Sequence, residues 1–304
     1  MKKQFERQKL KLKKKIAWQE NNEWRRTTAA YELDKSSLIV HSKMIKMPNI
    51  SSHTLVDLCG LNRYASVGKT VLSMFGFLEK QDIPLYQAIK GGIAEEFASQ
   101  FLDEIYGGRY DIESFTLEQF AGYNQFPQSK PFSGALDKLI HGDIKLPVEI
   151  KSKEMKDYQK IAIEKKYPKD QVVQGANQAY MFGADKFMML YVFLKPEISE
   201  YLQAITKSFP VEKTKEDENG NIITYTEQET LWSWGKDYEQ AVKDLGIKYE
   251  HFVFHYEIMD YDKRIIQAYR ERAQKIYNAF LTTRTLPRHM FKKEEIDDFR
   301  EFVI

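Results

Sequence analysis

The segment that most constrains the fold runs from residue 133 to residue 153 and reads SGALDKLIHGDIKLPVEIKSK. Strand-like alternation on both sides of Gly142 and Asp143 predicts two antiparallel strands joined by a turn. Because side chains alternate along a strand, Glu149 and Lys151 share one face of the second strand. An unpaired charge is costly to bury, so this charged face either meets water or binds something that neutralises it.

The length of the turn decides whether Asp137 on the first strand joins Glu149 on the second. With a two-residue loop, Asp137 would pair with Val148 and face away from Glu149. A three-residue loop, or a bulge at Pro147, would place both acids on the same face. Two carboxylates within about 5 Å raise each other's pKa unless a cation lies between them. Convergent acids would therefore predict a divalent cation, and all-oxygen ligands suit Mg²⁺ or Mn²⁺.

Lys151 places a positive charge beside this predicted acid pair. An ammonium group in that position can hold an attacking water or stabilise negative charge that develops on phosphorus. Two acids, a hard cation and a lysine together predict hydrolysis of phosphodiester bonds.

Other segments predict the elements around this hairpin. The serines of SSHTLVDLCG predict a capped helix, QVVQGANQAYMFG predicts a helix that ends at Gly183, and KFMMLYVFL predicts a buried strand. Apolar residues recur at helical spacing over residues 84–106 and 264–283. The expected apolar faces contain Ile93, Phe97, Phe101 and Ile105 in the first helix, and Ile265, Tyr269, Ile276, Tyr277 and Phe280 in the second.

Two features exclude other kinds of site. Gly68, Lys69 and Thr70 match the end of a phosphate-binding loop, but Arg63 stands where that loop needs its first glycine. The single cysteine, Cys59, excludes an intramolecular disulfide and a four-cysteine zinc site, and we expect a buried thiol there.

We expect three parts: a basic arm or helix over residues 1–48, a core over 49–198, and accessory strands and C-terminal helices over 199–304. Eight lysines and arginines cluster within residues 2–15, which suits a solvated tail and a phosphate-contacting arm equally. Asn219-Gly220 predicts a hairpin in the third part. The net charge of +2 does not by itself predict nucleic-acid binding. Because no run of 18 apolar residues and no apolar signal segment occurs, we expect a cytoplasmic protein without membrane association.

The hairpin resembles the metal-dependent nuclease family called PD-(D/E)XK, in which an acid precedes an acid-x-Lys strand. Asp137 followed by Glu149-Ile150-Lys151 matches that pattern, and residues 133–137 are similar to the S-G-x-x-D strand of one subgroup. This subgroup contains the RecB nuclease domain and phage lambda exonuclease. Its G-x-x-x-E-x-x-A helix resembles Gly91, Glu95 and Ala98.

The resemblance covers roughly residues 50–195 and implies a central mixed β-sheet flanked by helices. Together with the accessory strands and the C-terminal helix predicted above, the expected fold class is α/β with an accessory β-rich insertion and a C-terminal helix. It implies that Mg²⁺ or Mn²⁺ is bound by Glu95, Asp137 and Glu149, helped by the Ile150 carbonyl. Lys151 would be the catalytic lysine. Glu95 fits the motif spacing, and its neighbour Glu96 is the competing candidate.

A glutamine-rich helix downstream resembles the Q-x-x-x-Y helix of the same subgroup. Gln174 and Gln178 stand one turn apart with Gln171 on the same face, and Tyr180 follows. Because Gln178 stands where the motif has tyrosine, both glutamines remain candidates for the catalytic role, with Gln174 favoured. The DNA contacts that the resemblance implies are Ser52, Arg63, Lys153, Gln174, Gln178 and Tyr180.

The resemblance implies a deoxyribonuclease, and most closely a phage-type recombination exonuclease that acts on duplex DNA ends. DNA would be its partner, with a single-strand annealing recombinase and a homo-oligomer, such as a ring trimer, as further expected partners. Two alternatives remain open: a structure- or sequence-specific endonuclease or nickase of the same fold, and a catalytically inert DNA-binding or assembly module.

Overall fold

The protein is described here by a computed structural model that covers most of the chain. The described residues are 30–33, 36–41, 48–78, 84–114, 132–133, 136–143, 145–207, 209–216, 222–229, 242 and 246–300. The basic cluster of residues 2–15 and the Asn219-Gly220 turn, both predicted above, lie outside these ranges.

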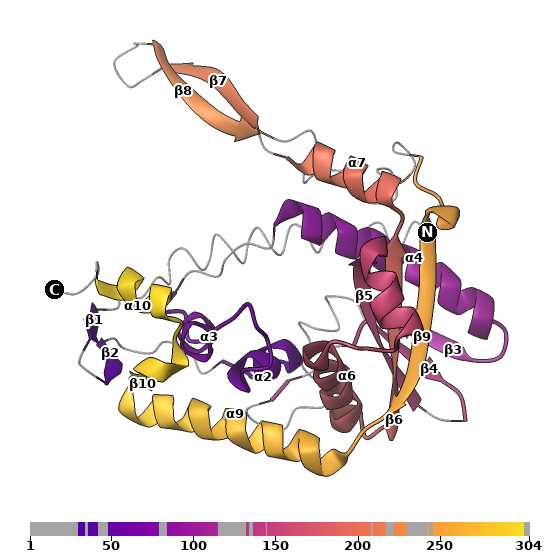
Figure 1. Cartoon of the computed structure of the whole chain (residues 1–304), viewed down its shortest axis with the longest axis horizontal. Helices are drawn as coiled ribbons and strands as arrows, with labels where there is room; N and C mark the ends of the chain where they lie inside the picture. The colour runs from indigo at the N-terminus through magenta and orange to yellow at the C-terminus, as the bar shows by residue number, and fades with distance from the viewer. Residues whose placement is uncertain are drawn as a thin grey trace.

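A five-stranded mixed sheet forms the centre of the molecule, with strand order β3-β4-β5-β6-β9 (Figure 1). β5 and β6 run parallel, and the other neighbouring strands pair antiparallel. This sheet, with helices on both faces, confirms the predicted fold class. The strands are β3 (Asp111–Ser114), β4 (Lys138–His141), β5 (Lys145–Glu154), β6 (Lys186–Leu194) and β9 (Phe252–Asp260).

Helices cover both faces of the sheet. α4 (Leu85–Tyr106) and α7 (Pro196–Thr206) bury one face, where Ile93 packs in one core with Val148 and Met188. α6 (Lys169–Phe182) covers the other face, and its small residues pack against β6. β6 is apolar along nearly its whole length because both of its faces are covered.

A second core joins the N-terminal and C-terminal parts of the described chain. α9 (Lys263–Thr283) runs along it beneath α2 (Ser52–Leu58) and α3 (Val67–Met74) (Figure 1). A small sheet of order β1-β2-β10 completes this part. Its strands are β1 (Ala30–Leu33), β2 (Ser37–His41) and β10 (Thr285–Pro287), and α10 (Lys293–Arg300) follows.

The ends of the helices follow the predicted signals. Ser51 caps α2 by accepting a hydrogen bond from the backbone N–H of Thr54. Gly183, with φ +68°, ends α6 in the left-handed conformation that glycine tolerates best. Gly68, Lys69 and Thr70 lie inside α3, so they form a turn of helix and no phosphate-binding loop.

Two details of the predicted apolar faces are wrong. Ile265 is 53% exposed, and Ile266, one residue later, is buried in its place. A shift of one residue moves a helical side chain by about 100° around the axis, enough to exchange buried and exposed positions. Ile105, in the last turn of α4, is 37% exposed.

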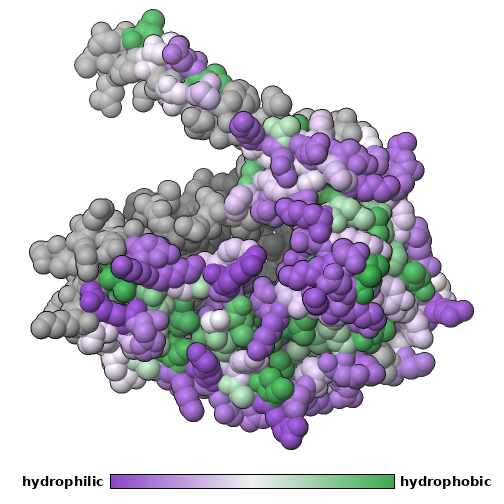
Figure 2. Space-filling model, viewed as in Figure 1, coloured by the Kyte–Doolittle hydropathy of each residue, from purple (hydrophilic) through white to green (hydrophobic). Residues whose placement is uncertain are grey.

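A long hairpin of β7 (Phe209–Glu216) and β8 (Ile222–Glu229) projects from the body beyond α7 (Figures 1 and 2). It confirms the predicted hairpin. Short turns complete the chain: η1 (Met155–Asp157), η2 (Gln159–Ile163), η3 (Tyr249–His251) and η4 (Arg288–Met290). Within the described ranges, no helix has the length and apolar character needed to cross a membrane.

Candidate active site

The β4–β5 hairpin has the odd loop that would bring the acids together. His141 pairs with Lys145 and Lys138 pairs with Val148, so three residues separate the last paired residues of the two strands and the loop length is odd. The ladder passes Pro147 without a bulge. Continued by one residue, this register places Asp137 opposite Glu149, as the convergent arrangement required.

Asp137 is held against β5 by a direct hydrogen bond. The backbone N–H of Ile150 donates to Oδ2 of Asp137 at 2.7 Å. Burial and the neighbouring Glu149 carboxylate raise the pKa of Asp137, while Lys151 acts in the opposite direction. Asp137 and Glu149 are therefore close enough to interact as charges.

Glu149 is almost fully enclosed, with its side chain 1% exposed. The ammonium of Lys151 donates a hydrogen bond to Oε1 of Glu149, whereas Oε2 has no hydrogen-bond partner within the described part of the chain. Burial acts to lower the pKa of Lys151, but Glu149 and Asp137 outweigh it, so the pKa is raised and the ammonium form is stabilised.

Glu95, the third predicted acid, lies on α4 with an exposed side chain. Its charge acts to raise the pKa of Lys151, which places it in the electrostatic neighbourhood of the acid pair. It also acts on Lys138, together with Glu96.

Lys138 is buried, and this burial lowers its pKa. Sequence reasoning did not single out Lys138, because a lysine in a strand is usually solvated.

The acid pair fits a hard divalent cation. Oε2 of Glu149 is a buried carboxylate oxygen in need of a partner, and Asp137 supplies a second oxygen ligand beside it. Across the described ranges, no three His, Cys, Asp or Glu side chains gather into a metal-binding cluster. Mg²⁺ takes most of its shell from water and substrate phosphate and needs only one or two carboxylates, so the pair suffices as a nucleus.

The glutamines of α6 occupy two kinds of environment. Gln178 is buried, while Gln171 and Gln174 are half-buried. Oε1 of Gln171 has no hydrogen-bond partner in the described residues. Lys153, on the same face of β5 as Glu149, is half-buried, and this burial lowers its pKa. The roles of Gln174, Gln178 and Lys153 in catalysis and DNA binding stay predictions.

The remaining predicted DNA contacts lie farther along the chain. Arg63 is exposed, and its guanidinium lies 4.6 Å from the ring centroid of Tyr64. Tyr180 is half-buried, and the guanidinium carbon of Arg270 lies 5.2 Å from the centroid of the Tyr180 ring. Ser52, in contrast, is only 4% exposed and so is not at the surface in this structure.

Ser52 belongs to a buried polar network that sequence reasoning missed. Nδ2 of Asn177 donates to Oγ of Ser52 at 2.8 Å, and Nη1 of Arg270 donates to Oδ1 of Asn177 at 3.0 Å. The network ties α2, α6 and α9 together. Asn177 falls within the glutamine helix, but its fully buried position depends on helices distant in sequence.

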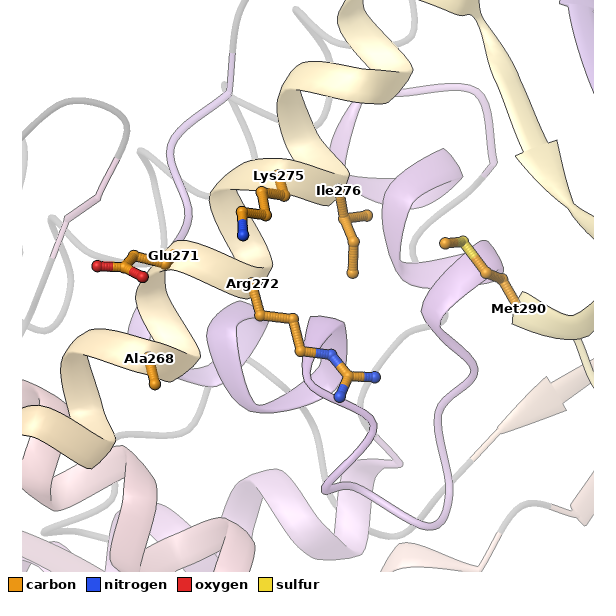
Figure 3. A pocket seen from close by; sticks show the side chains of 6 residues that line it. All are labelled: Ala268, Glu271, Arg272, Lys275, Ile276 and Met290. Carbon is orange, nitrogen blue, oxygen red and sulfur yellow. The ribbon is translucent and has the colours of Figure 1, made fainter.

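A surface hollow lies on α9, away from the acid pair. It measures about 510 Å³ and is lined by Ala268, Glu271, Arg272, Lys275, Ile276 and Met290. Figure 3 shows Arg272 and Ile276 reaching into it from α9, with Met290 on the opposite side. None of the predicted site residues lines it.

Comparison with known proteins gives distant structural likenesses. No protein-family model and no curated protein matches the chain. Among solved structures, it is similar to a phage-related exonuclease from Haemophilus somnus 129PT, with 14% identity over 78% of this chain and 96% of that one, and a TM-score of 0.46. It is also similar to an alkaline exonuclease, LHK-Exo, from Laribacter hongkongensis, with 10% identity over 77% and 92% of the two chains and a TM-score of 0.37. LHK-Exo in complex with dAMP gives a TM-score of 0.38, with 10% identity over the same shares of the two chains. At these identities and TM-scores, the function must be argued from the residues of this chain.

Proposed function

We propose that the protein is a metal-dependent deoxyribonuclease that hydrolyses phosphodiester bonds of DNA. The observation that carries the proposal is the three-residue loop of the β4–β5 hairpin, which sets Asp137 beside Glu149 and Lys151. Neighbouring buried carboxylates repel each other and lower stability, so a purely structural role gives no reason for the pair. A site that binds a cation and a phosphodiester explains why the two acids lie together.

Asp137 and Glu149 would hold Mg²⁺ or Mn²⁺. The sequence resemblance implies Glu95 and the Ile150 carbonyl as further ligands, and of these Glu95 does not gather with the acid pair into a three-acid cluster among the residues that this structure describes. Such an ion, when bound, polarises a phosphoryl oxygen and lowers the pKa of its bound water. Lys151 adds a fixed positive charge at the same place, since its ammonium is held by Glu149. That charge stabilises negative charge developing on the phosphoryl oxygens.

Within this class, we propose an exonuclease that acts on duplex ends, a choice that rests on the sequence resemblance to the lambda exonuclease subgroup. Closed circular duplex DNA separates this mode from internal cutting. An exonuclease leaves the circle intact and degrades the same DNA once it is linearised. Nicking or linearisation of the circle would instead identify an endonuclease.

The proposed chemistry is tested with end-labelled linear duplex, with and without Mg²⁺, using wild type and Lys151→Ala. We expect cleavage that requires Mg²⁺ and a loss of at least about 100-fold in the variant, as for removal of other groups that stabilise transition-state charge. Lys186→Ala is the matched control, because Lys186 is an exposed lysine at the start of β6, 3.2 Å from Asp260. Unaltered cleavage by a folded Lys151→Ala protein would contradict the proposal.

A further inference from the structure

Tyr191 lies next to the proposed catalytic residues in the central sheet. It pairs with Lys151 across the β5–β6 ladder, and its side chain belongs to the core on the face that α6 covers. The residue is fully buried, and its hydroxyl has no hydrogen-bond partner within the described ranges. Buried polar groups in native proteins are nearly always satisfied, so this hydroxyl requires an explanation.

A buried acceptor on the same face of the sheet also lacks a partner. Oε1 of Glu149 accepts from Lys151, and Oε2 accepts from no described residue. Glu149 pairs with Met189, two residues before Tyr191, so Glu149 and Tyr191 are diagonal neighbours on one face. Burial raises the pKa of Tyr191, and the nearby charges of Tyr167, Asp170 and Glu149 act in the same direction. A donor and an acceptor, each in need of a partner, thus occupy one region.

Tyr167 restrains the ring of Tyr191. The two rings stack with their centroids 5.9 Å apart and an interplanar angle of 12°. The hydroxyl of Tyr167 donates to Oε2 of Glu257 at 3.1 Å and lies 3.2 Å from Nε2 of His255. Both partners are on β9, so Tyr167 is anchored to the edge of the sheet. Tyr191 is therefore buried against an anchored ring, which limits how far its own ring can move.

We propose that Tyr191 is a positioning residue for Glu149. The hydroxyl of Tyr191 donates to Oε2 of Glu149 directly or through one bridging water. Glu149 would then be held at Oε1 by Lys151 and at Oε2 by Tyr191, which fixes the plane of the carboxylate. This inference deepens the proposed nuclease site and rests on it. Groups that orient a metal ligand typically contribute roughly 10- to 100-fold to metal affinity.

Asp170 is the rival acceptor for the same hydroxyl, because its charge also acts on Tyr191. It lies in the first turn of α6 and is half-buried, so water can satisfy its carboxylate. Glu149 is enclosed and cannot be satisfied in this way. The need for a donor therefore favours Glu149 over Asp170.

Metal affinity provides the first test, measured by isothermal titration of the full chain with Mn²⁺ alone. We expect Tyr191→Phe to weaken Mn²⁺ binding by roughly 10- to 100-fold. Tyr277→Phe is the matched control with unchanged affinity, since its hydroxyl donates to the Pro48 carbonyl at 3.0 Å in the other core. Wild-type affinity in Tyr191→Phe would overturn the inference. A wild-type protein that neither binds Mn²⁺ nor cleaves DNA would instead refute the proposed function.

A double-mutant cycle followed by thermal unfolding tests the same contact without metal. Tyr191→Phe should lower the Tm of wild type but not that of Glu149→Met, which lacks both carboxylate oxygens at similar length. The loss should persist in Asp170→Asn. An equal loss in the wild-type and Glu149→Met backgrounds, or one that disappears in Asp170→Asn, would overturn the inference. If Glu149→Met does not fold, the Mn²⁺ affinity of Tyr191→Phe decides.

Discussion

The backbone N–H of Ile150 donates a hydrogen bond of 2.7 Å to Oδ2 of Asp137, which fastens the first acid of the hairpin to the strand that carries the second. Because side chains alternate along a strand, this contact depends on the number of residues in the loop. The three residues 142–144 are therefore as much a part of the candidate site as the acids themselves.

Moving the first acid by one residue should separate the acids. In Asp137→Ala/Lys138→Asp the carboxylate lies on the residue that pairs with Val148, and side-chain alternation turns it to the face away from Glu149. We expect DNA cleavage to fall by at least about 100-fold, since small displacements of catalytic groups already have effects of that size. Cleavage of end-labelled duplex and far-UV circular dichroism measure activity and folding together. Asp143→Gly keeps both acids in place and should stay active, and wild-type cleavage by the folded double variant would contradict the register argument.

Local patterns in the sequence predicted the parts of this fold that depend on near neighbours. The helix of residues 84–106, the stop at Gly183 and the buried strand β6 all follow from periodicity and capping residues. The two acids of the hairpin were predicted to converge only if the loop was odd, and the loop proved to have three residues. Turn composition alone did not decide its length, because Gly142 and Asp143 suit several turn types.

Contacts between distant segments were beyond the reach of local patterns. Asn177 is buried because Ser52 and Arg270, far away in sequence, provide its hydrogen bonds. In the sequence, Tyr191 is one of several aromatic residues in an apolar strand. Only the parallel pairing of β6 with β5 shows that it lies beside Lys151. Such pairings are decided by the packing of whole elements.

Glu154, at the end of β5, should make stability depend on pH. Its carboxylate accepts hydrogen bonds from Lys90, at 2.9 Å, and from Tyr86 and Ser199. Burial acts to raise its pKa, but these hydrogen bonds outweigh it and lower the pKa below its usual value of 4.5. The folded state therefore favours the ionised form, so the stabilisation is present above about pH 4.5 and is lost as the pH falls through the lowered pKa.

The measurement is Tm against pH for wild type and Glu154→Gln. At pH 7 we expect the variant to lose about 3 kcal/mol, because Lys90 is left buried without its anionic partner. Between pH 6 and pH 3 the difference between the two proteins should narrow. Glu200→Gln, at an exposed position on α7, should unfold like wild type throughout. A difference that is constant with pH would contradict the assigned ion pair.

Two helical glycines should respond in opposite ways to alanine. A Cβ at Gly175 would lie 2.7 Å from ring carbons of Phe187 and 3.2 Å from Sδ of Met189, because α6 approaches β6 closely there. We expect Gly175→Ala to lose about 1–3 kcal/mol through overpacking. A Cβ at Gly91 meets no atom within 4 Å, so Gly91→Ala should gain up to about 1 kcal/mol from helix propensity. Urea unfolding of both variants checks this, and equal changes would contradict the close approach at Gly175.

Cys59 should react slowly with thiol reagents in the folded protein. Burial raises the pKa of its thiol to about 11, only partly offset by Arg272, and Sγ donates to the Tyr269 carbonyl at 3.4 Å. At pH 8 the thiolate fraction is then about 0.001, against roughly 0.2 for an ordinary thiol of pKa about 8.5. We expect labelling by a chromogenic disulfide to be at least about 100-fold slower in the native protein than in guanidinium, and to accelerate as the pH rises towards 11. Because the chain has a single cysteine, a Cys59→Ala protein serves as the blank. Rapid labelling of the native chain at pH 8 would show that this side of α2 opens to solvent and would contradict its place in the second core.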